Sequence, residues 1–305
     1  VSLGYKDYSQ AENAFDASDR DNVPSIKGDI LANGKAKINI QPWANVVGMY
    51  QPDSIASYTV NGQHFLVTAN EGDAREYFFQ ATQEECTAQG GIDWNEDDGC
   101  LSFNEEVRVE DLVGKAKLTP ALAKMTGEDQ LGRLLVTNTL GKNTKGEYET
   151  FYWYGARSFS IWAADGKQVF DSGSDFERIT ADRLKENFNA SNDRAQDDKK
   201  NDRSGAKGPE PEALTLGEID GRTYAFIGLE RVGGFMIYDI TIPDQAKFVS
   251  YTVNRDFGKN PTEEAAGDVG PEGMTFIAKA DSPTGLPLLI IGNEVSGSTS
   301  VYELR

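Results

Sequence analysis

The chain has 305 residues, 26% of them charged, and a formal net charge of −19. A net charge this negative argues against nucleic acid or anionic lipid as a partner. It favours binding of cations, or else a protein that its charge keeps soluble in salty surroundings. A hydrophobic content of 38% with 31 glycines suits a loop-rich β protein and not a disordered chain. No run of 18 apolar residues occurs, so no membrane-spanning helix is expected.

The first elements in chain order are strands. Residues 35–40 alternate apolar and polar side chains around two isoleucines, which predicts a first strand. Two further strands are predicted near 54–60 and 64–69. Asn61-Gly62 between them is a typical two-residue hairpin turn.

A long insertion, about 72–150, interrupts the pattern after this hairpin. It contains a predicted helix at 119–128 and a predicted strand at 133–140. Cys86 and Cys100 lie 14 residues apart in a polar, glycine-rich part of it. A disulfide between them would indicate an extracellular, cell-surface or periplasmic location, and two free thiols are the alternative.

Regular strand patterns return after the insertion. Residues 157–173 read as two strands around an Asp165-Gly166 turn, and residues 233–252 again read as strand, turn and strand. Between these two segments, residues 186–208 are polar and of low complexity, which predicts an exposed or mobile loop.

Three segments share one pattern: 52–73, 211–234 and 271–297. Each begins with Pro and an acid, runs through a strand, a turn and a second strand, and stops at a glutamate. The first and last acids are Asp53 with Glu71, Glu212 with Glu230, and Glu272 with Glu294. With the strands that follow each segment, the unit is four antiparallel strands. The repeat predicts an all-β chain, a β-propeller whose region spans 1–305.

The number of repeats is too small for a complete ring. Three units account for the chain, whereas a closed propeller needs at least four blades. Either residues 1–50 close the ring with irregular strands, or this chain is the C-terminal part of a larger propeller whose N-terminal half lies elsewhere in the protein. We favour the second hypothesis.

The residue types restrict the chemistry. His64 is the only histidine, so Ser-His-Asp or Cys-His catalysis and a typical zinc site are excluded, and no nucleotide-binding P-loop occurs. Carboxylates remain, and these are ligands for hard cations, above all calcium. In a propeller, the strand starts would form one ring of acids, Asp53, Glu212 and Glu272, and the strand ends a second ring, Glu71, Glu230 and Glu294. The alternative is that these acids only cap strand ends or pair with arginines.

Several longer motifs resemble a known family. They read YQPDSIA, TANEGDAREY, GARSFSIW, RSGAKGPEPEAL, YAFIGLERVGGFMIYDI, GPEGMTFI and LLIIGNEVSGSTSVYE. Together they are similar to the choice-of-anchor I proteins, which are bacterial extracellular or surface-anchored β-propellers, many of them labelled alkaline phosphatase or phytase-like. The resemblance runs from about Leu3 to Glu303. It implies a further N-terminal half, and the insertion with Cys86 and Cys100 is not part of the pattern.

The resemblance implies a site as well as a fold. By analogy with calcium-binding propellers that cleave phosphate esters, it assigns metal binding to Asp53, Glu71, Asp73, Glu212, Glu230, Glu272 and Glu294, and phosphate contacts to Arg75 and Arg231. The expected function is a calcium-dependent phosphoester hydrolase acting on a small anionic phosphoester. The alternative is a non-catalytic cell-surface or matrix propeller that binds a surface polymer and uses calcium as a structural brace.

Overall fold

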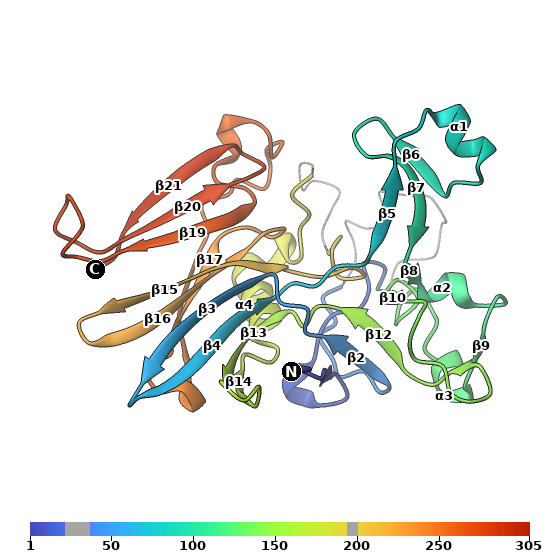
Figure 1. The fold of residues 1–305 in the computed structure, drawn as a ribbon, viewed down its shortest axis with the longest axis horizontal. Coiled ribbons are helices and arrows are strands. Elements are labelled where there is room, and N and C mark those ends of the chain that lie inside the picture. Colours follow the sequence, from blue (N-terminus) through green and yellow to red (C-terminus); the bar gives the residue numbers. More distant parts are fainter. Residues whose placement is uncertain (22–36, 194–200) are drawn as a thin grey trace.

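Strands dominate the computed structural model, which describes residues 1–21, 37–193 and 201–305 (Figure 1). The prediction of an all-β chain is confirmed at this level, and the described residues do not form a closed propeller or barrel. No helix in the described ranges has the length and apolar character needed to cross a membrane.

Two four-stranded antiparallel sheets and one three-stranded sheet carry the three repeats. The first has the order β14 (Gln168–Asp171), β13 (Ser158–Ala163), β4 (Gln63–Asn70) and β3 (Ser54–Val60). The second runs β15 (Pro211–Ile219), β16 (Arg222–Leu229), β17 (Phe235–Asp239) and β18 (Lys247–Thr252). The third runs β19 (Pro271–Ile277), β20 (Leu288–Asn293) and β21 (Ser298–Glu303). Figure 1 shows the three sheets side by side, with β3, β15 and β19 adjacent.

A five-stranded sheet joins the N-terminal residues to the predicted insertion. Its order is β1 (Tyr5–Asp7), β2 (Val46–Met49), β12 (Phe151–Tyr154), β10 (Leu135–Thr137) and β8 (Glu106–Arg108). Strands β2 and β12 pair in parallel, and the other neighbours are antiparallel. The segment 72–150 lies between β4 and β13, which are paired neighbours in the first repeat sheet, and its strands β8 and β10 share a sheet with the start of the chain.

The helices are short. They are α1 (Gln83–Ala88), α2 (Val109–Leu112), α3 (Pro120–Ala123) and α4 (Asp175–Leu184). The helix predicted over 119–128 is reduced to α3, since the amide of Met125 already bonds only three residues back, to Leu122; the backbone then turns at Gly127, whose carbonyl accepts from two later amides. A two-residue parallel pair, β9 (Lys117–Leu118) with β11 (Glu147–Tyr148), lies in the same region.

The predicted hairpin is confirmed. Its turn has positive φ at both central residues, 51° at Asn61 and 76° at Gly62, as a type I′ turn requires. The predicted strand at 35–40 is wrong over 37–40, and its first two residues lie outside the described residues. There the backbone amides of Lys37 and Asn39 donate to Asp21 and Asp16 and not to a neighbouring strand.

Alternation along β16 explains how the repeats pack. Ala225 and Ile227 face the core shared with the first repeat sheet, where they join Val67. Phe226 points the other way and packs with Leu289 of the third sheet. Since successive side chains of a strand alternate between its two faces, one strand serves two cores.

The predicted polar loop at 186–208 is largely buried in its described parts, although Glu186 and Asp193 are exposed, and residues 194–200 lie outside the description. Asn189, Asn201 and Ser204 have no exposed surface. The Asn201 side-chain amide donates to Asp16 Oδ2 at 3.0 Å and to the Ser18 carbonyl at 2.8 Å. These buried polar side chains hydrogen-bond to one another and to the N-terminal segment, and Asn189 Oδ1 alone among their oxygens has no partner in the described residues.

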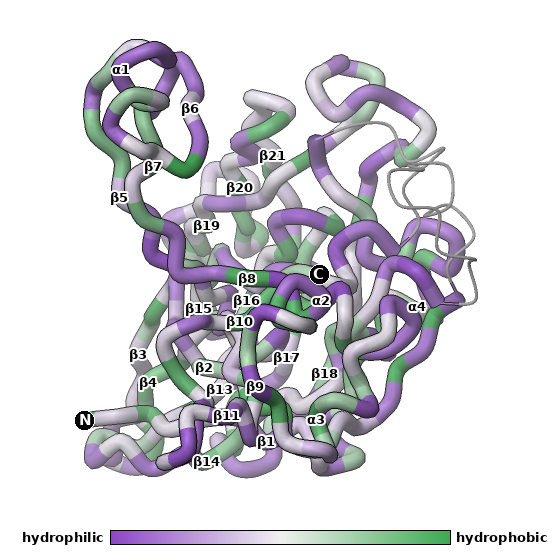
Figure 2. The backbone as a smooth tube through the Cα atoms, turned by 90° about the vertical axis from the view of Figure 1, so that its right-hand side faces the viewer, coloured by the Kyte–Doolittle hydropathy of each residue, from purple (hydrophilic) through white to green (hydrophobic). Residues whose placement is uncertain are grey.

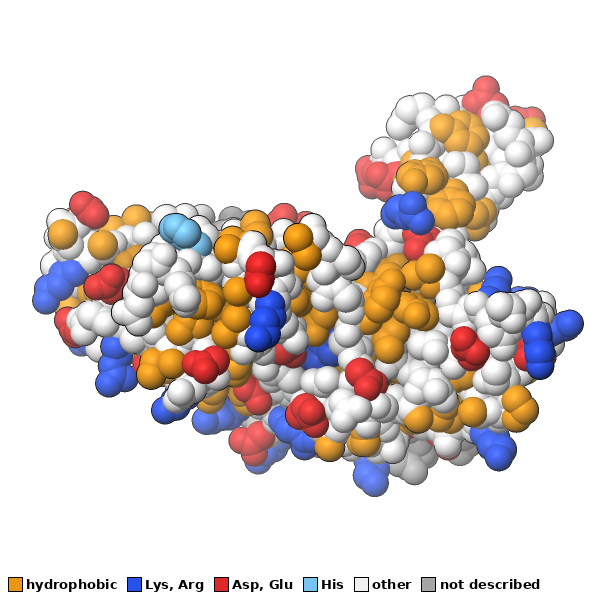
Figure 3. All heavy atoms as spheres, turned by 60° about the horizontal axis from the view of Figure 1, so that its bottom comes forward, with side chains coloured by type: hydrophobic (Ala, Val, Ile, Leu, Met, Phe, Trp, Pro, Cys, Tyr) orange, Lys and Arg blue, Asp and Glu red, His pale blue; other side chains and the backbone are white. Residues whose placement is uncertain are grey.

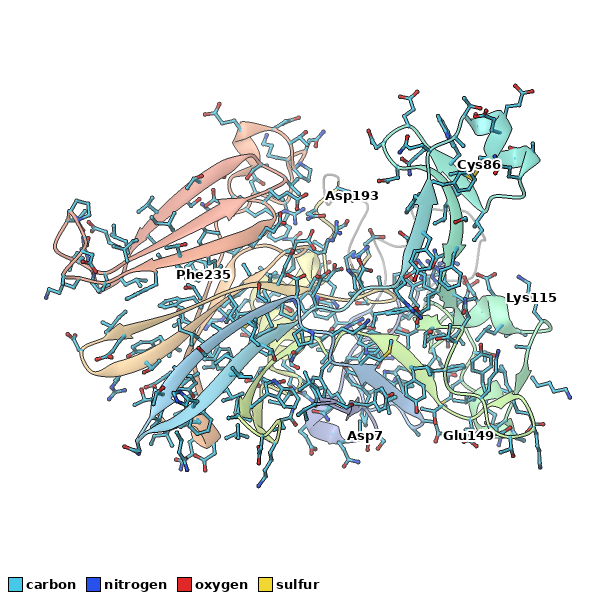
Figure 4. The ribbon with its side chains drawn as sticks, in the orientation of Figure 1. Asp7, Cys86, Lys115, Glu149, Asp193 and Phe235 are labelled. Atoms are coloured by element: carbon cyan, nitrogen blue, oxygen red, sulfur yellow. A yellow bond between two sulfur atoms is a disulfide. The ribbon has the colours of Figure 1, made fainter. Side chains whose placement is uncertain are left out.

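Residues 76–104 form a hairpin arm that stands clear of the sheets (Figures 1 to 3). Its strands are β5 (Glu76–Phe79), β7 (Gly99–Asn104) and β6 (Asp93–Asn95), with β7 in the centre. The predicted disulfide between Cys86 and Cys100 is confirmed and ties α1 to β7 (Figure 4). Both cysteines are buried, although the arm contributes to none of the core clusters.

Removing this disulfide is expected to unfold the arm without unfolding the sheets. In the chain-entropy model, a loop of this length contributes about 3 kcal/mol. We expect Cys86→Ser/Cys100→Ser to lose hydrogen-exchange protection over 76–104, with an unchanged melting temperature for the remaining chain. A fall of the whole melting curve, or retained protection in the arm, would contradict this separation.

Candidate functional site

Antiparallel pairing brings the repeated acids to one place. The amide of Asp53 donates to the carbonyl of Ala69 at 3.0 Å, so the start of β3 lies beside the end of β4. One oxygen each of Asp53, Glu71 and Glu212 lies within 4.8 Å of the others. The prediction of two separate rings for strand starts and strand ends is wrong here, because an antiparallel hairpin places both at the same edge of the sheet.

A second group of acids shares Glu71. Oxygens of Glu71, Glu210 and Glu230 also lie within 4.8 Å of one another. We call the set Asp53, Glu71, Glu210, Glu212 and Glu230 the acidic centre. It joins the ends of the first two repeats.

Basic side chains neutralise one half of the acidic centre. Glu210 is fully buried and is contacted by Arg203 Nη2 at 2.5 Å, Lys207 Nζ at 3.4 Å and Arg231 Nε at 3.3 Å. Burial alone would raise the pKa of Glu210, but these three positive charges outweigh it and lower the pKa to about 2. Lys207 Nζ also pairs with Glu71 at 2.5 Å.

In the other half, carboxylates surround Glu212, which has no basic partner among the described residues. Burial, together with the charges of Glu230 and Glu71, raises the pKa of Glu212 to about 9. Its Oε2 atom is buried and has no hydrogen-bond partner among the described residues. Burial likewise raises the pKa of Glu71 to about 7, although Lys207 opposes the shift. A bound cation would stabilise the charged forms of both carboxylates.

The remaining predicted metal ligands lie outside the acidic centre. Asp73 has a side chain that is 76% exposed and touches only the edge of the group, through Lys207 at 3.5 Å. Glu272 and Glu294 are exposed and hydrogen-bond to each other, and this contact comes first among the causes that raise the pKa of Glu272. They line a shallow hollow beside Asn293.

The two arginines that were expected to bind phosphate lie in different parts of the structure. Arg231 lies in the acidic centre, where Nε is 3.2 Å from Glu230 and Nη1 donates to Asn192 at 2.8 Å. Arg75 lies at the base of the arm and pairs with Glu105 at 2.5 Å. The structure therefore does not bring both arginines to one anion.

Sequence reasoning missed four members of this network: Asn192, Arg203, Lys207 and Glu210. Glu210 stands two residues before Glu212 in the doublet Pro-Glu-Pro-Glu at 209–212, and this doublet is a sequence signal for it. The other three belong to the polar stretch at 186–208, whose composition predicts a loop. Only the fold shows that this stretch lies against the strand ends.

A comparison with family models settles the family. The model of the choice-of-anchor I domain matches residues 1–243. The chain belongs to the choice-of-anchor I family. The family and the disulfide fit an extracellular or surface location.

Two curated proteins are similar to the chain. Gigasin-3a of Magallana gigas is 30% identical over 188 residues, which cover 57% of this chain and 65% of that protein. A mesenchyme-specific cell surface glycoprotein of Strongylocentrotus purpuratus is 26% identical over 276 residues, which cover 82% of this chain and 34% of that protein. The chain thus spans less than two thirds of either relative, and a bacterial source stays a prediction.

Proposed function

We propose that this chain is part of an extracellular or cell-surface β-propeller that binds a divalent cation, calcium first, and serves as a binding module. The observation that carries the proposal is the convergence of Asp53, Glu71 and Glu212 from two repeats. Among the described residues, Asp53 and Glu212 have no basic partner. The cell-surface name of one relative supports the location.

The donor set fits calcium. Calcium prefers carboxylate, carbonyl and water oxygens and tolerates irregular geometry. The three carboxyl groups, of which one has a buried, unpartnered oxygen, offer oxygen ligands to a hard cation, which would displace the proton that Glu212 keeps at neutral pH. The Glu71, Glu210 and Glu230 group fits less well, because Lys207, Arg203 and Arg231 already supply its positive charge.

The propeller architecture stays part of the proposal. It is supported by the four-strand meander from β15 to β18, by the matching pattern of the third sheet, and by the adjacency of the first strands of the repeats. The missing sheets of a ring would come from an N-terminal half of the same propeller.

Phosphoester hydrolysis is the weaker proposal. It requires positive charge beside the metal to bind the phosphoryl group. Arg75 is paired with Glu105 at the arm, and Arg231 is paired with Glu210 and Glu230. We therefore favour a binding module for a surface polymer, and expect no phosphate release from p-nitrophenyl phosphate or phytate with calcium present.

Thermal unfolding with calcium and with EDTA tests the cation site. Calcium at one hundred times its Kd should stabilise the protein by about 2.7 kcal/mol and raise the melting temperature by a few degrees. Glu212→Gln should abolish the increase. Glu218→Gln, a matched change at an exposed position of the same strand, should keep it.

Two results would reject the proposal. One is an identical melting curve in calcium, magnesium and EDTA, together with no heat of calcium binding in calorimetry. The other is an equal response of the Glu212 and Glu218 variants. Calcium-dependent phosphate release would instead favour the hydrolase.

A further inference from the structure

The hairpin arm carries a group of apolar side chains that lie in solvent. Tyr77 and Phe78 are 54% and 36% exposed, and the Tyr77 ring stacks on the half-buried ring of Phe103 at 5.2 Å between centres. Ile92 is 60% exposed, and its amide donates to the carbonyl of Leu101, the residue that pairs with Phe78. We call Tyr77, Phe78, Ile92 and Phe103 the arm patch. Single exposed apolar residues are ordinary, whereas a group of them marks an interaction surface.

The arm holds its shape through contacts of its own. The disulfide joins α1 to β7, and Trp94 Nε1 donates to the carbonyl of Ala81 at 2.7 Å. Thr82 and Glu85 form a reciprocal capping box at the start of α1. The arm patch therefore sits on a preformed support, which lowers the entropy that a partner must overcome on binding.

The arm is also strongly acidic. Its 29 residues include seven Asp and Glu and no Lys, Arg or His, so it accounts for −7 of the net charge of −19. Among the described residues, none of these seven carboxylates forms an ion pair with Lys or Arg. Glu76 is next to Tyr77, and Asp93 is next to Ile92, so two of the acids flank the arm patch. Figure 3 shows acidic side chains at the margins of the apolar surface of the arm.

This combination of apolar surface and unpaired acids selects the partner. A partner that covers the arm patch removes water from the flanking carboxylates, and this is favourable only if the partner brings positive charge. A second copy of the chain would bring another seven unpaired acids, so the charge opposes self-association through the arm. Arginine meets both requirements, because its guanidinium group stacks on aromatic rings and pairs with carboxylates through two hydrogen bonds.

We propose that the arm patch docks a basic segment of another protein, one that presents arginines beside apolar side chains. The apolar side chains of that segment cover Phe78 and Ile92. Its guanidinium groups stack on Tyr77 and pair with the carboxylates of Glu76 and Asp93. The proposal depends on the arm and not on the cation site.

A fluorescein-labelled synthetic peptide of four Arg-Leu pairs tests the proposal, by fluorescence anisotropy on the full chain. We expect it to bind in about 150 mM NaCl, with calcium and with EDTA alike, and several-fold more weakly in about 500 mM NaCl. A peptide with serine in place of leucine should bind about tenfold more weakly, because it keeps only the charge. A peptide with glutamate in place of arginine should not bind.

Two isoleucines of similar exposure provide matched variants for the apolar contact. Ile92→Ser should weaken binding of the Arg-Leu peptide about fivefold to tenfold and keep the melting temperature, because the side chain lies in solvent. Ile55→Ser, at a position of β3 that is 64% exposed, should leave peptide binding unchanged. The comparison separates the arm patch from general contact with exposed apolar residues.

Two pairs of exposed acids provide matched variants for the charge. Glu76→Gln with Asp93→Asn should weaken binding about fivefold and reduce its salt dependence. Glu263→Gln with Glu264→Gln makes the same change of net charge away from the arm and should have little effect. The comparison separates the arm from the overall negative charge of the chain.

Four results would overturn the proposal: no binding of the Arg-Leu peptide at about 100 μM, equal binding of the Arg-Ser peptide, equal effects of the two isoleucine variants, or equal effects of the two acid pairs. Self-association of the chain that Ile92→Ser removes would also overturn it, because the occupant would then be a second copy. Binding that EDTA abolishes would contradict its independence from the cation site.

Discussion

Replacing Arg157 with methionine is expected to destabilise the protein by about 3–5 kcal/mol, the range found when one partner of a buried ion pair is removed. The side chains of Arg157 and Glu177 are 2% and 1% exposed and form an ion pair. Methionine keeps much of the side-chain length but leaves the Glu177 carboxylate buried without a positive charge. Asn189 is its remaining side-chain donor, at 3.4 Å.

The same guanidinium group also links separate segments. Its Nη2 donates to the carbonyls of Ser204 and Ala206 at 2.6 and 2.8 Å, and its carbon lies 4.2 Å from the centre of the Trp153 ring. Those two carbonyls belong to the segment that carries Lys207. We therefore expect the Arg157 variant to disturb the acidic centre as well as the core.

Urea unfolding followed by tryptophan fluorescence measures this effect. Arg222→Met is the matched control, because Arg222 pairs with Asp239 at 3.1 Å but is 65% exposed, and it should cost no more than about 1 kcal/mol. Adding Glu177→Gln to the Arg157 variant should recover part of the loss. Similar costs for the two single arginine variants would contradict the role of burial.

Calcium binding is expected to release protons and to reverse the pH dependence of stability. With a folded-state pKa of about 9, Glu212 keeps its proton at pH values where the unfolded chain has lost it. Between about pH 4.5 and 9 the folded state therefore binds more protons, and the free energy of unfolding falls as pH rises. Glu71 acts in the same direction up to about pH 7. Calcium requires the deprotonated carboxylates and cancels this decline.

Glu210 contributes to the pH dependence of the free energy of unfolding with the opposite sign. Its pKa of about 2 lies below the unfolded value, so its contribution is complete above about pH 4.5 and is lost as pH falls through 2. Without calcium, the acidic centre should thus contribute most near pH 4 to 5. With calcium, we expect the maximum to move toward neutral pH.

Denaturation at several pH values, with EDTA and with calcium, checks these signs. Calorimetry in buffers of different ionisation enthalpy counts the protons released at neutral pH. Asp16 and Asp21, whose pKa burial raises to about 7, add to the decline, so Glu212→Gln is needed to isolate the acidic centre. An unchanged slope in that variant, or no proton release, would contradict the assignment.

Local patterns predicted the repeats well because their determinants are local. The hairpin at 61–62 follows from two residues that accept positive φ, and the later strand pairs follow from alternation. The five-stranded sheet was not predictable in this way. Its strands at 5–7, 46–49 and 151–154 are short and pair over long sequence distances.

The acidic centre was predicted in part for a related reason. Spacing identified Asp53, Glu71 and Glu212, because each lies at a strand end in a repeat. Spacing could not show that Lys207 and Glu210 neutralise some of these acids, since that depends on where a polar segment returns to the sheets. Residue type alone also could not separate Arg75 from Arg231.

The two-faced packing of β16 has a consequence for the divergence of the repeats. Phe226 stacks on Phe276 of the next sheet at 5.8 Å between ring centres, whereas Ile227 belongs to the core shared with the preceding sheet. A substitution on one face of β16 is accommodated by one neighbouring repeat. A substitution on its other face is accommodated by the other neighbouring repeat. Substitutions in the middle repeat should therefore co-vary with substitutions in both neighbouring repeats. Substitutions in the two outer repeats should be independent of each other.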